Sequence, residues 1–454
     1  MSRSAIPFAK GCILLIAGSS LAAATPSPSA ESSPVLDARL LILSPQSGNG
    51  KVDQEIARLQ AKIRDGYNAD PLIVELGWAF VAKARLTSDP GFYKIAEQCA
   101  SLAGEDSDSL LLRGHILHAL HRFNEAELVA RKIAASDSFA RWQTYALLGD
   151  ALMEQGKLSE ALNAYQRMID IRPCLQTYAR VAHFRWLKGD LAGAEELMRM
   201  AVSAGNSRDP EPAAWAYSRL AFYQFQGGKS KAAAQSLVRA FDFVKDYPPA
   251  LFLRAKLEVD QSPAKAVESL RRAAAQSPLP EYEWALADAA KLAGNSELAA
   301  ATEHAILVHG AAEDQRSFSL FLAHRNLKPE LALQLAENEM SNRRDVFTYD
   351  ALAWAEFAAG KKREANENIR RALSEGTADA RLYYHAGKIV LAAGDRTEAV
   401  QWFRRATAIQ QVLLPSERDD LMREVASVRI PQTARAMLSP TNPQLAGDGL
   451  TREK

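Results

Sequence analysis

The sequence predicts an all-α fold, a right-handed α-solenoid built from antiparallel helix pairs. Seven times, a small residue is followed seven positions later by a glycine (once by a histidine) and twelve positions later by an alanine. Neighbouring units start about 33 to 39 residues apart, close to the ~34-residue period of a two-helix repeat. The chain has 454 residues, 48% hydrophobic, and a net charge of +1, as expected of a folded protein without a strongly basic or acidic partner. The triplets are Gly114, His121, Ala126; Gly149, Gly156, Ala161; Ala182, Gly189, Ala194; Ala221, Gly228, Ala233; Ala287, Gly294, Ala299; Ala353, Gly360, Ala365; and Gly387, Gly394, Ala399.

The amino terminus has the layout of a secretory signal. Arg3 and Lys10 precede an apolar run over residues 11–24 that ends in three alanines, which predicts a signal peptide over residues 1–24 with cleavage after Ala24. The run of about 14 residues is shorter than the ~20 residues that a permanent membrane-spanning helix needs. We therefore expect export to the periplasm, or secretion, with no stable membrane insertion after cleavage. Anchoring by an uncleaved signal is the alternative.

A spacer, the helical array and a tail follow. Residues 25–50 begin with a stretch rich in Ser and Pro and are expected to form a flexible spacer. Residues 51–430 are expected to hold about ten helical pairs with capping helices. Lys51–Arg64 has apolar residues at helical spacing and should be the first cap. A last cap is expected over Ser416–Val428 with Ser416 as N-cap, and residues 431–454 should be disordered.

Individual units follow the pattern to different degrees. The clearest covers residues 142–173, where Leu148, Tyr165 and Pro173 accompany the triplet. The first unit, residues 72–102, is expected to have a longer loop over residues 87–91. Residues 250–278 lack the glycine, and residues 317–342 have Leu320 in place of a small residue. The superhelix is therefore least defined by the sequence at these two units.

The unit over residues 142–173 closely resembles the tetratricopeptide repeat family, and two units within residues 346–410 match nearly as well. The resemblance implies helix pairs that meet through small residues, and a superhelix whose concave side is lined by the first helix of every unit. It implies binding without naming a partner. Packing gives a physical reason for the pattern, because Gly149 and Ala161 let two backbones approach closely, and Gly156 suits the left-handed residue that ends a helix.

Candidate binding residues follow from this geometry. Positions three before, one after and four after the small residue share one helical face, which should be the concave one. Aromatic and arginine side chains supply much of the binding energy in protein interfaces. The alternative is that these rings pack between neighbouring units. The candidates are Arg180, His183, Trp186, Arg219, Phe222, Asp350, Trp354, Tyr384, His385 and Lys388.

Other chemistry finds little support. Cys99 and Cys174 belong to units two repeats apart, so a disulfide between them is not expected. Three histidines recur along one predicted helix, but they cannot easily converge on one ion, and no metal site or cofactor is predicted. No nucleophile elbow, phosphate loop or dinucleotide motif occurs in a suitable context, and no long Lys/Arg run suggests nucleic acid. We therefore expect no enzyme activity. The three histidines are His115, His118 and His121.

The functional prediction is a non-enzymatic scaffold or adaptor of the periplasm or cell envelope. It should bind a protein or peptide partner in its concave groove, as part of an envelope assembly. The alternative is an accessory protein for polysaccharide binding or export, in which aromatic faces stack on sugar rings. Homo-oligomerisation through the segment near Leu320 is a third, minor reading. The sequence leaves open whether the groove is accessible.

Overall fold

The computed structural model describes residues 34–67, 69–136, 141–205 and 210–428. Within these ranges the regular elements are α-helices and one short 3₁₀ helix, which confirms the all-α class. The predicted signal peptide (residues 1–24) and disordered tail (residues 431–454) lie outside the described residues. None of the described helices is long and apolar enough to cross a membrane.

Two helices, α1 (Pro34–Leu43) and α2 (Lys51–Arg64), precede the repeats, and α2 has the bounds predicted for the first cap. Ten helix pairs follow, and we call their odd-numbered members the first helices. A 3₁₀ turn, η1 (Gln410–Val412), and α23 (Pro415–Ser427) end the array. The pairs are α3 (Ala69–Thr87) and α4 (Gly91–Leu102); α5 (Ser107–Ala119) and α6 (Phe123–Ser136); α7 (Trp142–Glu154) and α8 (Leu158–Ile171); α9 (Leu175–Leu187) and α10 (Leu191–Ser203); α11 (Pro210–Gln226) and α12 (Ser230–Phe243); α13 (Pro248–Glu258) and α14 (Pro263–Gln276); α15 (Pro280–Leu292) and α16 (Ser296–Glu313); α17 (Gln315–His324) and α18 (Pro329–Asn342); α19 (Val346–Ala358) and α20 (Lys362–Leu373); α21 (Ala380–Ala392) and α22 (Arg396–Ala408).

Small residues set the distance between the helices of a pair. A Cβ atom added to Gly149 would lie 2.4 Å from the ring of Tyr165, and one added to Gly387 would lie 2.4 Å from the ring of Phe403. Both rings are fully buried. Because a side chain at either glycine would overlap a ring, the glycine lets the aromatic residue of the second helix fill the pair's core.

The turn between the two helices contains a left-handed residue in each of the seven units that carry the triplet. Gly156 has φ +71°, and in the one triplet without the middle glycine His121 takes its place with φ +60°. Histidine is among the non-glycine residues found most often in this conformation. The single exception among the seven triplets is therefore the same turn made at a higher steric cost.

Two expectations for the amino-terminal part are wrong. The spacer predicted for residues 25–50 contains α1, because Ile42 is fully buried against the neighbouring helices and its carbonyl accepts a 2.8 Å hydrogen bond from the Gln60 amide. The long loop expected over residues 87–91 is also absent. The extra residues lengthen α3 to Thr87, and only residues 88–90 connect it to α4.

At the other end, Ser416 is not the N-cap of α23. The N-cap is Leu414, whose N–H donates a 2.9 Å hydrogen bond to the Glu417 carboxylate. Ser416 instead donates from its N–H and its hydroxyl to Asp288 Oδ2, at 2.9 and 2.6 Å. The two units with the weakest sequence pattern nevertheless form ordinary pairs, and Leu320 is buried in the core.

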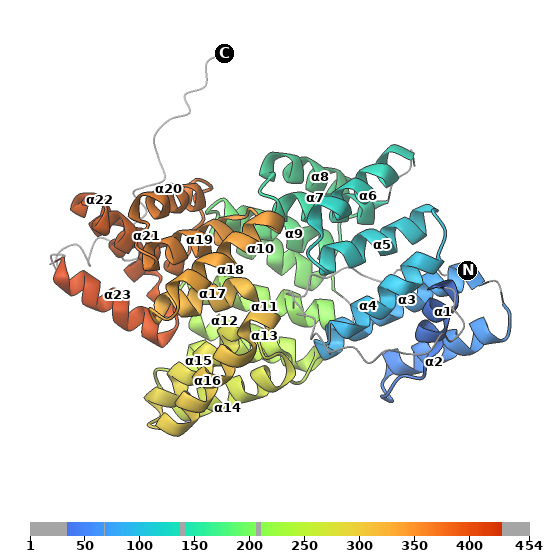
Figure 1. Ribbon diagram of the computed structural model, residues 1–454, viewed down its shortest axis with the longest axis horizontal. Coiled ribbons are helices and arrows are strands. Elements are labelled where there is room, and N and C mark those ends of the chain that lie inside the picture. The colour runs from blue at the N-terminus through green and yellow to red at the C-terminus, as the bar shows by residue number, and fades with distance from the viewer. Residues whose placement is uncertain (1–33, 68, 137–140, 206–209, 429–454) are drawn as a thin grey trace, which may run out of the picture.

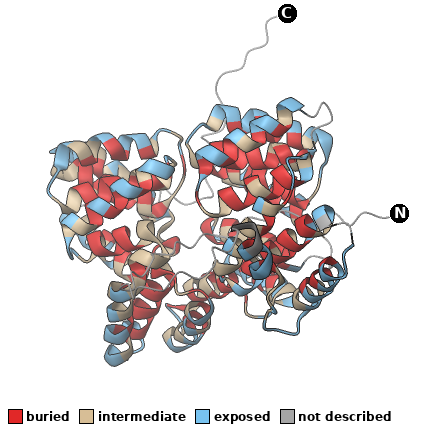
Figure 2. Cartoon of the chain, turned by 45° about the vertical axis from the view of Figure 1, so that its right-hand side comes forward, coloured by how far each residue is buried: buried red, intermediate tan, exposed pale blue. Residues whose placement is uncertain are grey.

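The superhelix closes on itself. The carboxyl ends of α7, α9 and α11 meet the segments that lead into α19 and α21, although the hydrogen-bonded residues are 152 to 190 positions apart. Figure 1 shows the chain running from α1 and α2 through the paired helices to α22 and α23. Buried residues lie where helices face one another in both turns, and exposed residues follow the outer sides (Figure 2). We call α7–α12 the first turn of the superhelix and the part from α18 to η1 its second turn; the second turn lies against the first.

Candidate binding face on the first helices

The structure divides the ten predicted binding residues into two clusters and two separate residues. Six of them are buried, namely Arg180, Trp186, Asp350, Trp354, Tyr384 and His385, and the others are half-buried. The half-buried four are His183, Arg219, Phe222 and Lys388. A largely buried set does not form the open aromatic groove that the sequence pattern predicts.

The first cluster joins α9 and α11 and contains His183, Trp186, Arg219 and Phe222. The guanidinium of Arg219 lies over the rings of Trp186 and Phe222, 5.4 and 5.0 Å from their centroids. His183 stacks on Trp186 with centroids 5.6 Å apart, and its Nδ1 lies 3.4 Å from Arg219 Nη2. We call these four residues the Arg219 cluster.

Arg219 has rings around it rather than a counter-ion. Among the residues that the structure describes, no carboxylate is within ion-pair distance of its guanidinium, and its buried Nε has no hydrogen-bond partner. Aromatic faces attract a cation but replace only part of its hydration. This arginine is therefore the candidate residue with the most unsatisfied binding capacity.

Residues that the sequence pattern missed close one side of the Arg219 cluster. Phe347, at the start of α19, stacks on Trp186 with centroids 5.7 Å apart, and Gln226 accepts a 2.8 Å hydrogen bond from the Trp186 indole. Phe347 comes from the second turn of the superhelix, 161 positions further along the chain than Trp186. No periodic signal within a unit could have indicated this contact.

The second cluster packs between neighbouring units, which is the alternative interpretation given above for the aromatic candidates. It consists of Asp350, Trp354, Tyr384 and His385. His385 stacks on Trp354 with centroids 4.0 Å apart, and its Nδ1 lies 2.8 Å from Asp350 Oδ1. The Tyr384 hydroxyl donates to Asp420 at 3.3 Å. All four residues of this cluster are buried, so they hold α19, α21 and α23 together.

Two remaining candidates have partners within the chain. Lys388 pairs with Glu424 of α23 at 3.0 Å. Arg180 donates to both oxygens of Asp150, at 2.9 and 3.1 Å, and the Tyr165 hydroxyl donates to the same carboxylate at 2.8 Å. Both ends of the Arg180 pair are buried. We therefore assign Arg180 to the packing between α7 and α9.

The three histidines singled out in the sequence have neighbours within the fold, and His118 and His121 both pack on the Phe123 ring. Burial, together with the nearby charge of Arg85, lowers the pKa of His115 well below its usual range, and Arg85 Nη2 lies 2.8 Å from His115 Nε2. Within the described part of the chain, no group of three His, Cys, Asp or Glu side chains could hold a metal ion. Cys99 and Cys174 are both free thiols.

A buried carboxyl group on α15 predicts a pH effect on stability. Burial, with a smaller contribution from the charge of Glu313, raises the pKa of Glu283 to about 7. Burial lowers the pKa of neighbouring His309, whose Nε2 lies 3.3 Å from Glu283 Oε1, so no imidazolium compensates the carboxylate near neutral pH. The folded chain binds the proton of the Glu283 carboxyl group more tightly than the unfolded chain does. Protonation of Glu283 therefore stabilises the fold fully below the ordinary Glu pKa, and this stabilisation is lost as pH rises through about 7.

The wild-type free energy of unfolding should fall by roughly 1–3 kcal/mol between about pH 5 and pH 8 because of this group, and Glu283→Gln should not show this fall. Urea unfolding at both pH values measures it, with the exposed Glu297→Gln on α16 as control. Parallel pH profiles for wild type and Glu283→Gln would show that this carboxyl does not titrate in that range.

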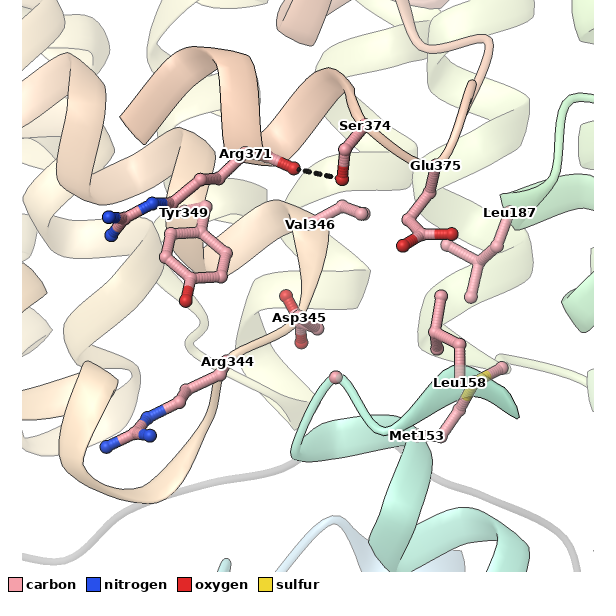
Figure 3. Close-up of a pocket in the computed structure, with 11 residues that line it drawn as sticks. Met153, Leu158, Leu187, Arg344, Asp345, Val346, Tyr349, Arg371, Ser374 and Glu375 are labelled. Carbon is pink, nitrogen blue, oxygen red and sulfur yellow. Dashed lines mark hydrogen bonds between the residues drawn. The ribbon is translucent and has the colours of Figure 1, made fainter. Parts of the chain in front are cut away.

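A cavity of about 220 Å³ lies between the two turns of the superhelix. One wall is apolar and the other carries charged and polar groups of α19 and α20 and their connections (Figure 3). The polar wall is largely satisfied internally, because Glu375 pairs with Lys188 and Asp345 caps α19. The apolar wall consists of Met153, Leu158 and Leu187, and Val346 lies on the α19 side.

Comparisons with known proteins find a family resemblance in two of the ten helix pairs. A family model described as tetratricopeptide repeat matches residues 143–173 and 380–412, the units of α7 and α8 and of α21 and α22. A search of curated proteins found no match. Two similar solved structures are yeast Tom70, with 12% identity over 85% of this chain and 98% of that chain (TM-score 0.38), and human IFIT1, with 15% identity over 89% and 92% (TM-score 0.37).

A tetratricopeptide repeat protein from Parabacteroides merdae is 20% identical over 55% of this chain and 97% of that chain, with a TM-score of 0.30. Likenesses with these TM-scores do not establish a shared overall course of the chain. The family model therefore matches two of the ten helix pairs. The eight other pairs, before and between them, have the same two-helix design, and a fold of such repeats is typically a non-enzymatic protein-binding scaffold.

Proposed function

We propose that the chain is an exported, non-enzymatic adaptor of the cell envelope that binds a protein segment at the Arg219 cluster. The single observation that carries the proposed site is the half-buried guanidinium of Arg219, which lies among aromatic rings with no carboxylate partner in the described part of the chain. Arginine and tryptophan are enriched among residues that dominate interface energies. Half-buried His183 and Phe222 extend this face on α9 and α11.

The envelope location rests on the amino-terminal sequence. Two basic residues, an apolar run over residues 11–24 and three alanines at its end are typical of a secretory signal. An adaptor with this signal acts on the far side of the inner membrane. Fractionation of cells that express the full chain, together with the amino-terminal sequence of the accumulated form, tests this part of the proposal. An amino terminus at Met1 in the cytoplasmic fraction would contradict it.

The polysaccharide alternative receives less support from this geometry. Stacking on a sugar needs an open aromatic face, whereas Trp186 is only 4% exposed and has His183 and Phe347 against it. We therefore keep glycan binding as an outcome of the test rather than as a second proposal.

Substitution of Arg219 tests the site. We expect Arg219→Ala to lower recovery of the partner roughly tenfold in affinity capture from the cell envelope, because it removes the charge from the centre of the face. Arg239→Ala on α12, where the arginine pairs with Asp242 at the surface, is the matched control and should recover the partner as wild type does. Equal recovery by Arg219→Ala and wild type would exclude this face, and retention of glycans alone would favour the alternative.

A further inference from the structure

The carboxyl ends of three successive first helices form a strip of hydrogen-bond acceptors. The last carbonyls of a helix have no N–H partner within the helix, and the helix dipole makes this end partly negative. In α7, α9 and α11 these carbonyls belong to Glu154, Leu187, Phe225 and Gln226, and all four lie at the contact between the two turns. We call them the acceptor strip.

The second turn satisfies every carbonyl of the acceptor strip with a donor. The Arg344 N–H donates to the Glu154 carbonyl at 2.9 Å, and the Thr377 hydroxyl donates to the Leu187 carbonyl at 2.6 Å. The side-chain amide of Gln411 donates to both carbonyls at the end of α11, at 3.1 and 3.0 Å. The donors thus belong to three separate segments of the second turn.

A guanidinium and a ring add to these backbone contacts. Arg343 donates to the Glu154 carboxylate at 2.9 Å, and Phe347, four positions later, stacks on Trp186. Both side chains belong to the segment of residues 343–347, which connects α18 to α19 and includes the first two residues of α19. This segment therefore contacts the first turn as a ligand would, with a cation at an acidic helix end and a ring on an aromatic face.

The contact between the turns is less complete than the contacts within a turn. Helices α7 and α9 contact the later part of the chain at their carboxyl ends, through residues of the segments that precede α19 and α21. Most of the contacts named above between the two turns are hydrogen bonds or ion pairs. The 220 Å³ cavity interrupts the packing of apolar side chains between the turns (Figure 3). Regions held by few apolar contacts open at lower free energy than a packed core.

We propose that the contact between turns is a releasable latch, in which the chain's own second turn occupies the acceptor strip in place of a partner segment. The partner segment that the strip fits is donor-rich and carries a guanidinium and an aromatic ring four positions apart, as Arg343 and Phe347 are. Its entry removes Phe347 from Trp186 and uncovers the Arg219 cluster. The identification of the occupant as a protein segment rests on the proposed function, whereas the opening of the latch does not.

Hydrogen exchange of the full chain tests the opening. The double variant Thr377→Val with Gln411→Leu removes two donors of the latch at nearly constant side-chain size, and Thr407→Val, whose hydroxyl bonds the Phe403 carbonyl within α22, is the matched control. We expect amide exchange of residues 343–347 and 376–379 to rise roughly tenfold or more in the double variant, with α7–α12 unchanged inside their helices. Unchanged exchange at the contact, or an equal rise throughout the chain, would overturn the latch.

A synthetic peptide of residues Ser341–Tyr349 tests the chemistry of the occupant. We expect fluorescence anisotropy to show at least about tenfold tighter binding to the double variant than to wild type, because an open strip no longer competes with its intramolecular ligand. The same peptide with Arg343→Ala and Phe347→Ala should not bind. No binding to the double variant, or equal binding of both peptides, would overturn the assigned ligand chemistry. Neither readout depends on the cellular partner, so a failure of the Arg219→Ala capture remains distinguishable.

Discussion

Replacing Asp150 with alanine is expected to lower the free energy of unfolding by about 3–5 kcal/mol, because it leaves the buried guanidinium of Arg180 without a counter-ion. Asp150 accepts hydrogen bonds from Arg180 and from the Tyr165 hydroxyl, and all three side chains are buried. Urea unfolding followed by circular dichroism measures the effect. The change should not alter helix content at low urea, since it affects side-chain pairing and not the helix backbone.

The double variant Asp150→Ala with Arg180→Met separates charge from packing. Replacing both members of a buried ion pair by apolar groups is often neutral, so this variant should regain most of the stability lost by Asp150→Ala. Tyr165→Phe, which removes one neutral donor, should cost only about 1 kcal/mol. A wild-type urea midpoint for Asp150→Ala would show that Arg180 finds another partner or water.

Phe403→Ala is expected to cost about 3–5 kcal/mol, the second of the two largest effects. The Phe403 ring is fully buried and fills the space beside Gly387, where a Cβ would meet it at 2.4 Å. Because glycine has no side chain that can move into the cavity, the neighbouring helix would have to shift as a whole. Differential scanning calorimetry measures the loss, with the exposed Gln401→Ala on the same helix as control. A loss near that of the control would show that α21 and α22 can close the gap.

The helix pairs and their contacts could be predicted because they depend on neighbours in sequence. The spacing from Gly149 to Ala161 reports a local event, two helices that approach through small residues, and it repeats in seven of the ten pairs. The pairing of Asp150 with Arg180 is also within reach of the sequence, since first helices of consecutive units lie side by side and the two residues are 30 positions apart. The pattern indicated Arg180 but not its carboxylate partner.

The contact between turns could not be predicted in the same way. Whether Phe347 meets Trp186 depends on the rotation between units, and small differences in this rotation add up over the units that separate the two residues. Trp354 and Tyr384 lie on the first helices as predicted. They are buried because their rings pack between α19 and α21, and α23 accepts the hydrogen bond of the Tyr384 hydroxyl.

The closed superhelix has a consequence for the length of the array. An open solenoid tolerates gain or loss of one unit, because each unit contacts only its two neighbours. Here Arg343 must reach Glu154, and Thr377 must reach Leu187, across an intervening stretch of fixed length. Duplication or deletion of a single unit within residues 191–342 would move each donor past its acceptor. The number of repeats between the two turns should therefore be held constant during evolution.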